Sequence, residues 1–241
     1  TTTIDNRLQK KAEEALEAKL RSLERTPGYP HQTRAAWREQ PEATRKRPQY
    51  IQGSVAVVEN LTGAILAIVG GRDADESKFN RALHGRRQIG SVFKPFVYLA
   101  GFETGIRPDT LISDGPIARG EIRGAGNWRP QNSDGKFGGF LPASTGLIRS
   151  RNTMSVRIGN RAGIEKVADV ALSVGFETPM PRLPTSYLGA WEATTLEVAS
   201  AYTVFPNEGT RFAPRLIKEI RDRSGNVIWP SRRDVSPYIS Y

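Results

Sequence analysis

Two short runs of almost wholly apolar residues constrain the fold of this chain more than any other feature. Residues 53–59 and 64–69 are rich in Val, Ile and Ala, and the residues between them, Asn60-Leu61-Thr62-Gly63, are typical of a β-hairpin turn. Because both runs are apolar nearly throughout, we expect both faces of the hairpin to be buried. The sequence therefore predicts an α/β (α+β) fold in which helices cover a sheet.

Several segments carry the periodicity of helices. Residues 4–23 place apolar side chains at spacings of three and four, with Thr3 as the expected N-cap. Residues 91–105 are apolar almost all round, which indicates a buried helix. Further helices are expected at 153–160, 164–173 and 196–205, and a second hairpin at 216–222 and 227–229.

Two other segments lack periodicity and are expected to be loops. Residues 26–50 contain four Pro, and residues 114–139 are rich in Gly. We therefore expect a single domain over 1–241 with a loop insertion at about 26–50. No apolar stretch approaches the roughly 20 residues that a membrane span needs.

Composition narrows the chemistry that the chain can perform. It contains no Cys and only two His, His31 and His84. This excludes thiol nucleophiles and Cys-ligated metals, and it leaves little material for a His-based metal site or a Ser-His-Asp triad. Acid–base chemistry must therefore use Lys, Asp, Glu or Tyr, and we expect neither a metal nor a cofactor.

Ser91 and Lys94 form the nucleophile–base pair that this composition favours. They stand three residues apart at the start of the predicted buried helix, which places the hydroxyl and the amine on one face. The helix N-terminus favours negative charge that develops on the serine or on an attacked carbonyl. Apolar surroundings lower the pKa of a lysine, so that the neutral amine can take the serine proton.

Spacing alone does not establish this pair. The segment Ser133–Lys136 has the same spacing inside a Gly-rich turn, and Ser91 can also be read as a helix N-cap with Lys94 reaching solvent. Ser150 and Asn152 are candidates for relaying a proton and for holding a substrate amide. Their alternative role is to cap the helix that follows.

The order and spacing of the motifs resemble the transpeptidase domain of penicillin-binding proteins. The motifs are Asn80-Arg81-Ala82, Gln88 to Phe96, Asn127-Trp128-x-Pro130-x-Asn132 and Ser150-x-Asn152. The opening residues 2–9, and later Leu188-Gly189, Glu197 to Tyr202 and Asn207-x-Gly209-Thr210, are similar to the class A, bifunctional branch. The resemblance covers the chain except for residues 26–50.

This resemblance implies a β-lactamase/transpeptidase-like fold, with an antiparallel sheet flanked by helices and a helical lobe that carries Ser150 and Asn152. Ser91 would attack the penultimate D-Ala carbonyl of a peptidoglycan stem peptide, with Lys94 as the base. Ser150 would relay a proton, and Asn152 would bind the substrate backbone. An amine of a neighbouring stem peptide then forms the cross-link, and β-lactams acylate the same serine.

Two tryptophans are candidates for a substrate groove. Trp128 and Trp191 could line a groove for glycan, and anchoring a loop or the core is the alternative for both. We expect Trp128 to bind substrate together with Asn152.

The chain departs from the family pattern in its third motif. None of its Lys residues is followed by Thr-Gly or Ser-Gly, and Ile89 stands where the family commonly has Pro. We therefore expect the C-terminal strands, with half of the oxyanion hole, to be missing from a partial domain that is inactive or incomplete alone. A second chain could carry them. A non-catalytic module that binds peptidoglycan or a partner protein, and a β-lactamase or β-lactam sensor, remain as alternatives.

The net charge of +10 points first to nucleic acid as a partner. The basic residues are, however, spread thinly and lack interleaved aromatics, so we expect no specific nucleic-acid binding and only a general affinity for anionic surfaces. The resemblance implies stem peptides and β-lactams as ligands. It also implies a place on the extracytoplasmic face of the membrane, the periplasm in a Gram-negative, with an anchor that precedes Thr1.

Overall fold

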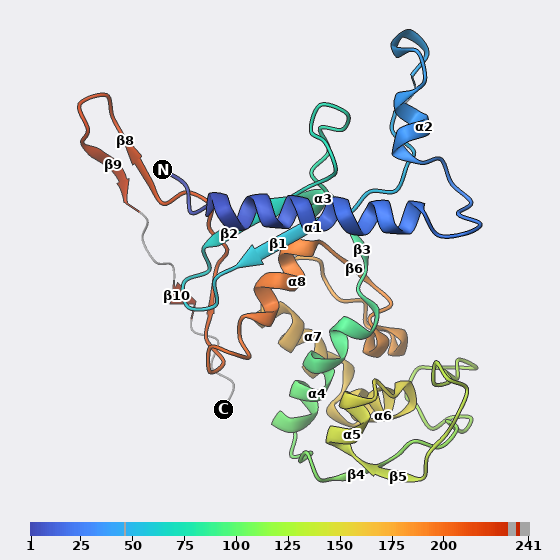
Figure 1. The fold of residues 1–241 in the computed structure, drawn as a ribbon. Coiled ribbons are helices and arrows are strands. Elements are labelled where there is room, and N and C mark those ends of the chain that lie inside the picture. The colour runs from blue at the N-terminus through green and yellow to red at the C-terminus, as the bar shows by residue number, and fades with distance from the viewer. Residues whose placement is uncertain (46, 231–234, 237–241) are drawn as a thin grey trace. The chain divides into compact units, whose positions relative to one another are not determined.

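The computed structural model describes residues 1–45, 47–230 and 235–236, and the chain divides into two compact units (Figure 1). The first unit comprises residues 1–86 and the described residues from 194 onward, and the second comprises residues 87–193. The first unit contains α1 (Asn6–Glu24), α2 (Arg34–Arg38), the 3₁₀ turn η1 (Glu42–Thr44), β1 (Val55–Val58), β2 (Ile65–Val69), α3 (Arg81–His84), α8 (Thr195–Tyr202), β7 (Arg211–Phe212), β8 (Glu219–Arg221), β9 (Val227–Pro230) and β10 (Val235–Ser236). The second contains β3 (Arg87–Gln88), η2 (Gly90–Phe93), α4 (Lys94–Glu103), β4 (Leu111–Ser113), β5 (Phe140–Pro142), α5 (Ala143–Ile148), α6 (Asn152–Ala162), α7 (Ile164–Ser173), η3 (Pro184–Leu188) and β6 (Glu192–Ala193).

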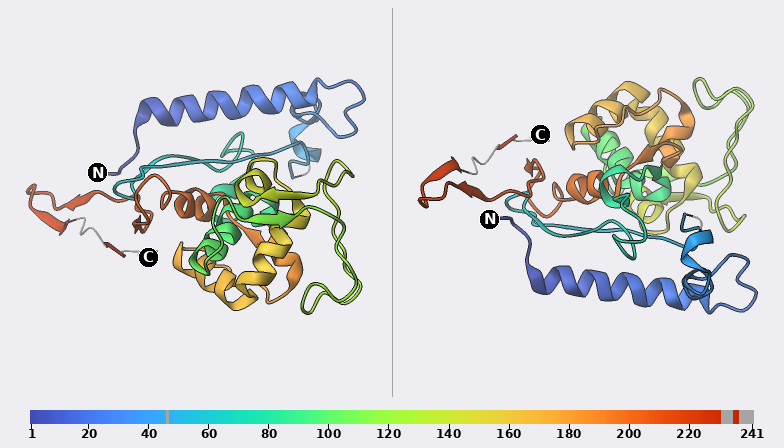
Figure 2. Two further views of the ribbon diagram at one scale, coloured as in Figure 1. Left: turned by 90° about the horizontal axis from the view of Figure 1, so that it is seen from below. Right: turned by 90° about the horizontal axis from the view of Figure 1, so that it is seen from above.

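The antiparallel hairpin β1–β2 forms the centre of the first unit. Val55 lies opposite Val69, and the register shifts at a bulge near the turn. Helix α1 covers one face, where Ala12 packs on Ala67 and Val69, and α8 lies on the other face (Figure 2). The predicted hairpin and its helical cover are confirmed. Every residue of β1 is nevertheless only half-buried, and in the described part of the chain β1 pairs with β2 alone.

The N-terminal segment closes the outer edge of β2. The Asp5 N–H donates to the carbonyl oxygen of Leu66 at 2.9 Å, and the Gln9 side chain accepts from the Ile68 N–H at 2.8 Å and donates to its carbonyl oxygen at 3.1 Å. Asp5, not Thr3, is the N-cap of α1, because its carboxylate accepts two N–H bonds of the first turn. Thr3 instead donates its hydroxyl to backbone carbonyls of the edge.

Residues 26–50 differ from the expected loop, because they contain the helical segments α2 and η1. Thr33 caps α2 with its side chain, and Trp37 is buried edge-on against Tyr50, with ring centroids 5.4 Å apart. This cap and this apolar anchor explain a helix where the sequence shows no periodicity.

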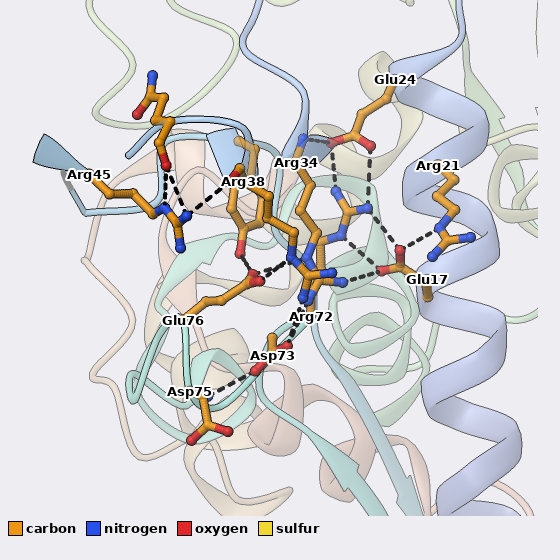
Figure 3. Close-up of polar contacts among 12 residues, drawn as sticks. Glu17, Arg21, Glu24, Arg34, Arg38, Arg45, Arg72, Asp73, Asp75 and Glu76 are labelled. Carbon is orange, nitrogen blue, oxygen red and sulfur yellow. Dashed lines mark hydrogen bonds and ion pairs between the residues drawn. The ribbon is translucent and has the colours of Figure 1, made fainter. Parts of the chain in front are cut away.

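A cluster of arginines and carboxylates ties this segment to α1 (Figure 3). The Arg72 side chain, 1% exposed, bonds to Glu17 at 2.9 Å and to Glu24 at 2.6 Å. Arg34 pairs with Glu76 at 2.9 Å. The hydrogen bond from Arg72 outweighs burial and lowers the pKa of Glu17 to about 2. The cluster therefore joins α1, α2 and the loop after β2 through paired, partly buried charges.

Helix α4 is the core of the second unit. Its residues Phe96, Val97 and Tyr98 are fully buried, which confirms the buried helix predicted at 91–105. Phe93 and Trp191 lie edge-to-face with centroids 5.2 Å apart, within a cluster that also contains Phe96 and Phe176. Trp191 therefore anchors the core and does not line a groove.

The remaining elements follow the sequence closely. Helices α6 and α7 and the hairpin β8–β9 lie where they are predicted, and α8 begins with the expected capping box but ends at Tyr202, before Phe205. Residues 114–139 contain neither helix nor strand, as expected. The pair β4–β5 and helix α5 were not predicted. None of the helices in the described ranges combines the length and apolar character that crossing a membrane requires.

Candidate active site

Ser91 is exposed and lies in the 3₁₀ turn that leads into α4. Residues 189–191, which are distant in the sequence, fix the segment before it. Gly90, at φ +60°, donates its N–H to the carbonyl oxygen of Gly189 at 2.9 Å, and Ile89 donates to that of Trp191 at 2.9 Å. A Cβ atom on Gly189 would overlap the Gly90 backbone, and Gly189 itself has φ +71°. A glycine is therefore required there to place Ser91.

Lys94, the first residue of α4, is 1% exposed. Its Nζ donates to the carbonyl oxygen of Ser150 at 2.7 Å, to the Ser150 hydroxyl at 2.9 Å and to Asn152 Oδ1 at 2.7 Å. Burial, and then the positive charge of Arg151, lower its pKa to about 8. Within the described ranges, the Ser91 hydroxyl makes no hydrogen bond in this structure.

Ser150 is held in a left-handed conformation, with φ +53°. It follows α5, where its N–H bonds to the Leu147 carbonyl at 3.0 Å and the Arg151 N–H bonds to that of Gly146 at 2.8 Å. This turn usually takes glycine, and a residue with a Cβ atom costs about 1–2 kcal/mol there. The strained turn aims both the carbonyl and the hydroxyl of Ser150 at Lys94.

A buried polar cluster stands behind this turn. Asn132 Oδ1 accepts from the Asn152 N–H at 2.8 Å, and its Nδ2 donates to Asp114 at 2.9 Å. Asp114, fully buried, also accepts from the Thr153 hydroxyl at 2.6 Å and pairs with Arg151 at 2.7 Å. Burial alone would raise the pKa of Asp114, but the hydrogen bonds from Arg151 and its other donors hold that pKa at about 2.

Sequence reasoning noted Asn132 only as part of a motif and did not single out Asp114. Asp114 precedes Gly115 and Pro116, so it has the signature of an ordinary turn residue. The spacing within the S-x-N motif cannot predict that the carboxylate of Asp114, which is distant in sequence, lies beside it. The only local signal is that Asn132 begins a run of turn-forming residues, in which an Asn side chain commonly bonds to the backbone.

Among the described residues, the side chains of the other candidates make no recorded hydrogen bond to this cluster. Trp128 is half-buried in the Gly-rich segment, and the structure records no contact that tests its role in binding substrate. Ser133 and Lys136 are both exposed, so their matching spacing comes without the burial of Lys94. Among the residues that the structure describes, no group of three or more His, Asp or Glu is arranged to hold a metal ion.

The arrangement can support proton transfer and nucleophilic attack. Lys94 is a buried amine with a pKa near physiological pH, and three oxygen atoms orient it. Ser91 lies one turn before Lys94, and the backbone carbonyl oxygen of Ser91 accepts the backbone N–H of Lys94. Hydrogen bonds between nucleophile and base commonly tighten only once substrate is bound.

Comparison with known proteins yields consistent matches. The sequence model of the penicillin binding protein transpeptidase domain matches residues 53–240. The chain is 38% identical over 192 residues to Penicillin-binding protein 1A of Rickettsia conorii, with 80% of this chain and 24% of that protein covered. It is 37% identical over 179 residues to Penicillin-binding protein 1A of Neisseria gonorrhoeae, with 73% and 22% covered. The chain thus spans about a quarter of the length of these relatives.

Solved structures share the fold. Penicillin-Binding Protein 1A from Haemophilus influenzae superimposes with a TM-score of 0.82 at 24% identity, over 97% of this chain and 46% of that chain. The PonA1 protein from Mycobacterium tuberculosis, solved in complex with penicillin V, gives a TM-score of 0.72 at 22% identity, over 96% and 57%. Both likenesses concern the fold.

Proposed function

The chain belongs to the penicillin-binding protein transpeptidase domain family, and we propose that it carries the acylation site of an enzyme that cross-links peptidoglycan. The predicted class A transpeptidase domain and its fold are confirmed. The observation that supports the proposed reaction best is the buried Lys94 amine. It is bonded to Ser150 and Asn152 one turn beyond an exposed Ser91.

In the proposed reaction, Ser91 Oγ attacks the carbonyl carbon of the penultimate D-Ala in a stem peptide. The neutral Lys94 amine takes the hydroxyl proton, and Ser150 passes a proton to the amine of the leaving D-Ala. The bond to the terminal D-Ala breaks and leaves an ester on Ser91. An amine of a second stem peptide then attacks this ester, and the serine regains its proton as the cross-link forms.

Two further residues bind substrate in this proposal. The Asn152 amide, already oriented by Lys94 and by the carbonyl oxygen of Gln131, offers its remaining hydrogen to the peptide backbone. In the same proposal, Trp128 contacts the bound peptide. β-Lactams acylate Ser91 in the place of the stem peptide. We propose that the reaction takes place outside the cytoplasmic membrane, where the polymer is.

The pKa of Lys94 suits this role. At about 8, it leaves roughly a tenth of the amine neutral at pH 7, whereas an ordinary lysine would be almost wholly charged. After proton transfer, the Lys94 ammonium can donate to the same three oxygen atoms, which stabilise its charge. Lys94 is therefore both a competent base and a stable acid.

We infer that the present residues supply only part of the oxyanion hole, because no Lys precedes Thr-Gly or Ser-Gly. In this proposal the other donor comes from a strand that carries the motif, for example on a second chain. We expect the 241 residues alone to be acylated slowly, because the loss of one such donor costs about 10²–10³ in rate. This absence also supports the second candidate function, a non-catalytic module that binds peptidoglycan or a partner.

Labelling with a fluorescent penicillin decides between these functions. The protein in its natural full length is incubated with the reagent, and the labelled peptide is identified by mass spectrometry. We expect label on Ser91, none after Ser91→Ala, and unchanged labelling after Ser133→Ala, which removes the serine of the second S-x-x-K match. Label that survives Ser91→Ala contradicts the assigned nucleophile. A protein that takes no label but binds isolated peptidoglycan fits the non-catalytic module.

A further inference from the structure

Three buried side chains outside the S-x-x-K and S-x-N motifs meet at the back of the candidate site. Asp114, Asn132 and Thr153 are each at most 4% exposed. Asp114 comes from the loop after β4, Asn132 from the Gly-rich segment and Thr153 from the first turn of α6. These parts of the chain are distant in sequence, and they converge on the N-terminus of α6, directly after the Ser150–Asn152 turn.

The N-terminus of α6 depends on this convergence. Its N-cap residue, Arg151, makes no side-chain cap. Asn132 Oδ1 instead accepts the N–H of Asn152 at 2.8 Å and that of Thr153 at 3.3 Å. Asn132 is held in that orientation because its Nδ2 donates to Asp114 at 2.9 Å and to the Lys136 carbonyl at 3.0 Å. A distant amide therefore caps the helix that carries Asn152.

Arg151 is fixed between the two members of the S-x-N motif. Its Nε and Nη2 bond to Asp114 at 2.8 and 2.7 Å, and its Nη1 bonds to Asp134 at 2.9 Å. The Arg151 side chain is 11% exposed and Asp114 is fully buried, whereas the Asp134 side chain is 49% exposed. Asp114 is thus the main buried countercharge of the cation nearest to Lys94.

We propose that Asp114 and Asn132 are positioning residues of this site, which hold the Ser150–Asn152 turn against Lys94 and balance the charge of Arg151 beside it. The inference rests on the proposed acyl-transfer function. Through Asn132, the Asp114 carboxylate fixes the backbone of Asn152. Through Arg151, it fixes the residue between Ser150 and Asn152. Lys94 is bonded to both ends of this turn, so a loosened turn leaves the amine without its acceptors.

The balance of charge has a definite sign. The charge of Arg151 disfavours a proton on Lys94. Asp114 is paired with Arg151, so its negative charge should offset part of that effect. Removal of the Asp114 charge should therefore lower the pKa of Lys94, and removal of the Arg151 charge should raise it. If Asp114 and Arg151 only stabilised the start of α6, neither substitution would change the pKa of Lys94.

The other ionisable groups on the elements packed against α4 are paired elsewhere, exposed or uncharged; Arg161 of α6 and Glu165 and Asp169 of α7 are exposed. Helix α5 and the turn η2 contain no ionisable side chain. On α6, Arg157 pairs with Glu121, and on α7, Lys166 pairs with Glu103, the last residue of α4. The turn η3 contributes Tyr187, whose pKa is raised by burial. Lys136 of the Gly-rich segment is exposed, and Asp134 binds Arg151 from the solvent side.

The test titrates Lys94 directly by NMR, using lysine labelled with ¹³C at Cε, with the Lys94 signal identified by its loss in Lys94→Met. We expect Asp114→Asn to lower the pKa by about one unit and Arg151→Met to raise it by about as much, as for a unit charge several ångströms away in a protein interior. The control is Glu121→Gln, which breaks the ion pair of Glu121 with Arg157 of α6 and should leave the pKa of Lys94 unchanged. A Lys94 titration that moves in neither site variant overturns the proposed charge balance.

Acylation by fluorescent penicillin supplies the second measurement. For Asp114→Asn, the pH profile should shift to lower pH while the limiting rate falls by about a hundredfold, because the turn loses its position. An unchanged limiting rate overturns the positioning role. Should Asp114→Asn alone fail to fold, the double variant with Arg151→Met leaves no unpaired buried charge, and its limiting rate should fall likewise. A wild-type protein that takes no label contradicts the proposed function instead, and the NMR titration still judges the inference.

Discussion

The Gly90 N–H donates a 2.9 Å hydrogen bond to the carbonyl oxygen of Gly189, so a residue far along the chain fixes the turn that carries Ser91. The two backbones lie close enough that a Cβ atom on Gly189 would overlap Gly90. Placement of the candidate nucleophile therefore depends on a glycine pair outside the S-x-x-K motif.

Substitution of Gly189 by Ala should displace Ser91. We expect Gly189→Ala to slow labelling by fluorescent penicillin by about a hundredfold, because misplacement by an ångström costs that much. The free energy of unfolding should fall by about 1–3 kcal/mol from overpacking and the left-handed backbone. Gly105→Ala is the matched control, since Gly105 has φ +92° and open space around it. It should lose some stability but keep its labelling rate, and equal labelling of both variants would contradict the positional role of Gly189.

Labelling should depend on pH through Lys94. Its pKa of about 8 predicts that the acylation rate falls tenfold per pH unit below 8 and levels off above it. Lys94→Arg should abolish the reaction at every pH, because a guanidinium does not deprotonate in proteins. Lys136→Arg is the control, as it alters the exposed lysine of the second S-x-x-K match. A flat profile between pH 6 and 9, measured as initial labelling rate, would remove Lys94 as the base.

Two substitutions at Ser150 separate strain from chemistry. Both Ser150→Gly and Ser150→Ala remove the hydroxyl that accepts from Lys94, so both should slow labelling to a similar extent. Only Ser150→Gly relieves the left-handed backbone at φ +53°, and it should be about 1–2 kcal/mol more stable than Ser150→Ala in urea unfolding. Labelling at the wild-type rate in either variant would exclude the hydroxyl from proton transfer.

The local elements were predictable because their signals are local. The hairpin turn at 60–63, the capping box at Thr194 and the apolar helix after Ser91 each act within a few residues. The prediction of the first cap was wrong because a distant partner decides it: Asp5 replaces Thr3 as the cap of α1, and Thr3 bonds to the edge of β2. For Trp191 the sequence left a groove and the core as alternatives, and the rings of Phe93 and Phe176 place it in the core.

The candidate site shows the same division. The resemblance of spaced motifs pointed to Ser91, Lys94 and the S-x-N turn, and the structure brings Lys94 and that turn together. The sequence could not reveal Asp114, because its carboxylate acts through Asn132 and Arg151 across a long loop. The roles of these residues in catalysis stay predictions until labelling tests them.

The charge cluster of the first unit leads to a prediction about stability. Arg72 is almost fully buried between Glu17 and Glu24, so Arg72→Met leaves two carboxylates without their main partner and should cost about 3–5 kcal/mol. The control is Arg21→Met. The Arg21 side chain also pairs with Glu17 but is 61% exposed, so its loss should lower the free energy of unfolding by less than about 1 kcal/mol.

The pH dependence of unfolding identifies the electrostatic part of this cost. Arg72, with smaller contributions from Arg21 and Arg34, lowers the pKa of Glu17 from its ordinary 4.5 to about 2, so the paired carboxylate stabilises the folded state fully above pH 4.5. That contribution, about 3 kcal/mol, is lost as the pH falls from 4.5 toward 2. Urea unfolding at pH 7, 4 and 3 should therefore show a steeper loss of stability for the wild type than for Arg72→Met. Parallel losses in the two proteins would mean that Arg72 stabilises the unit by packing alone.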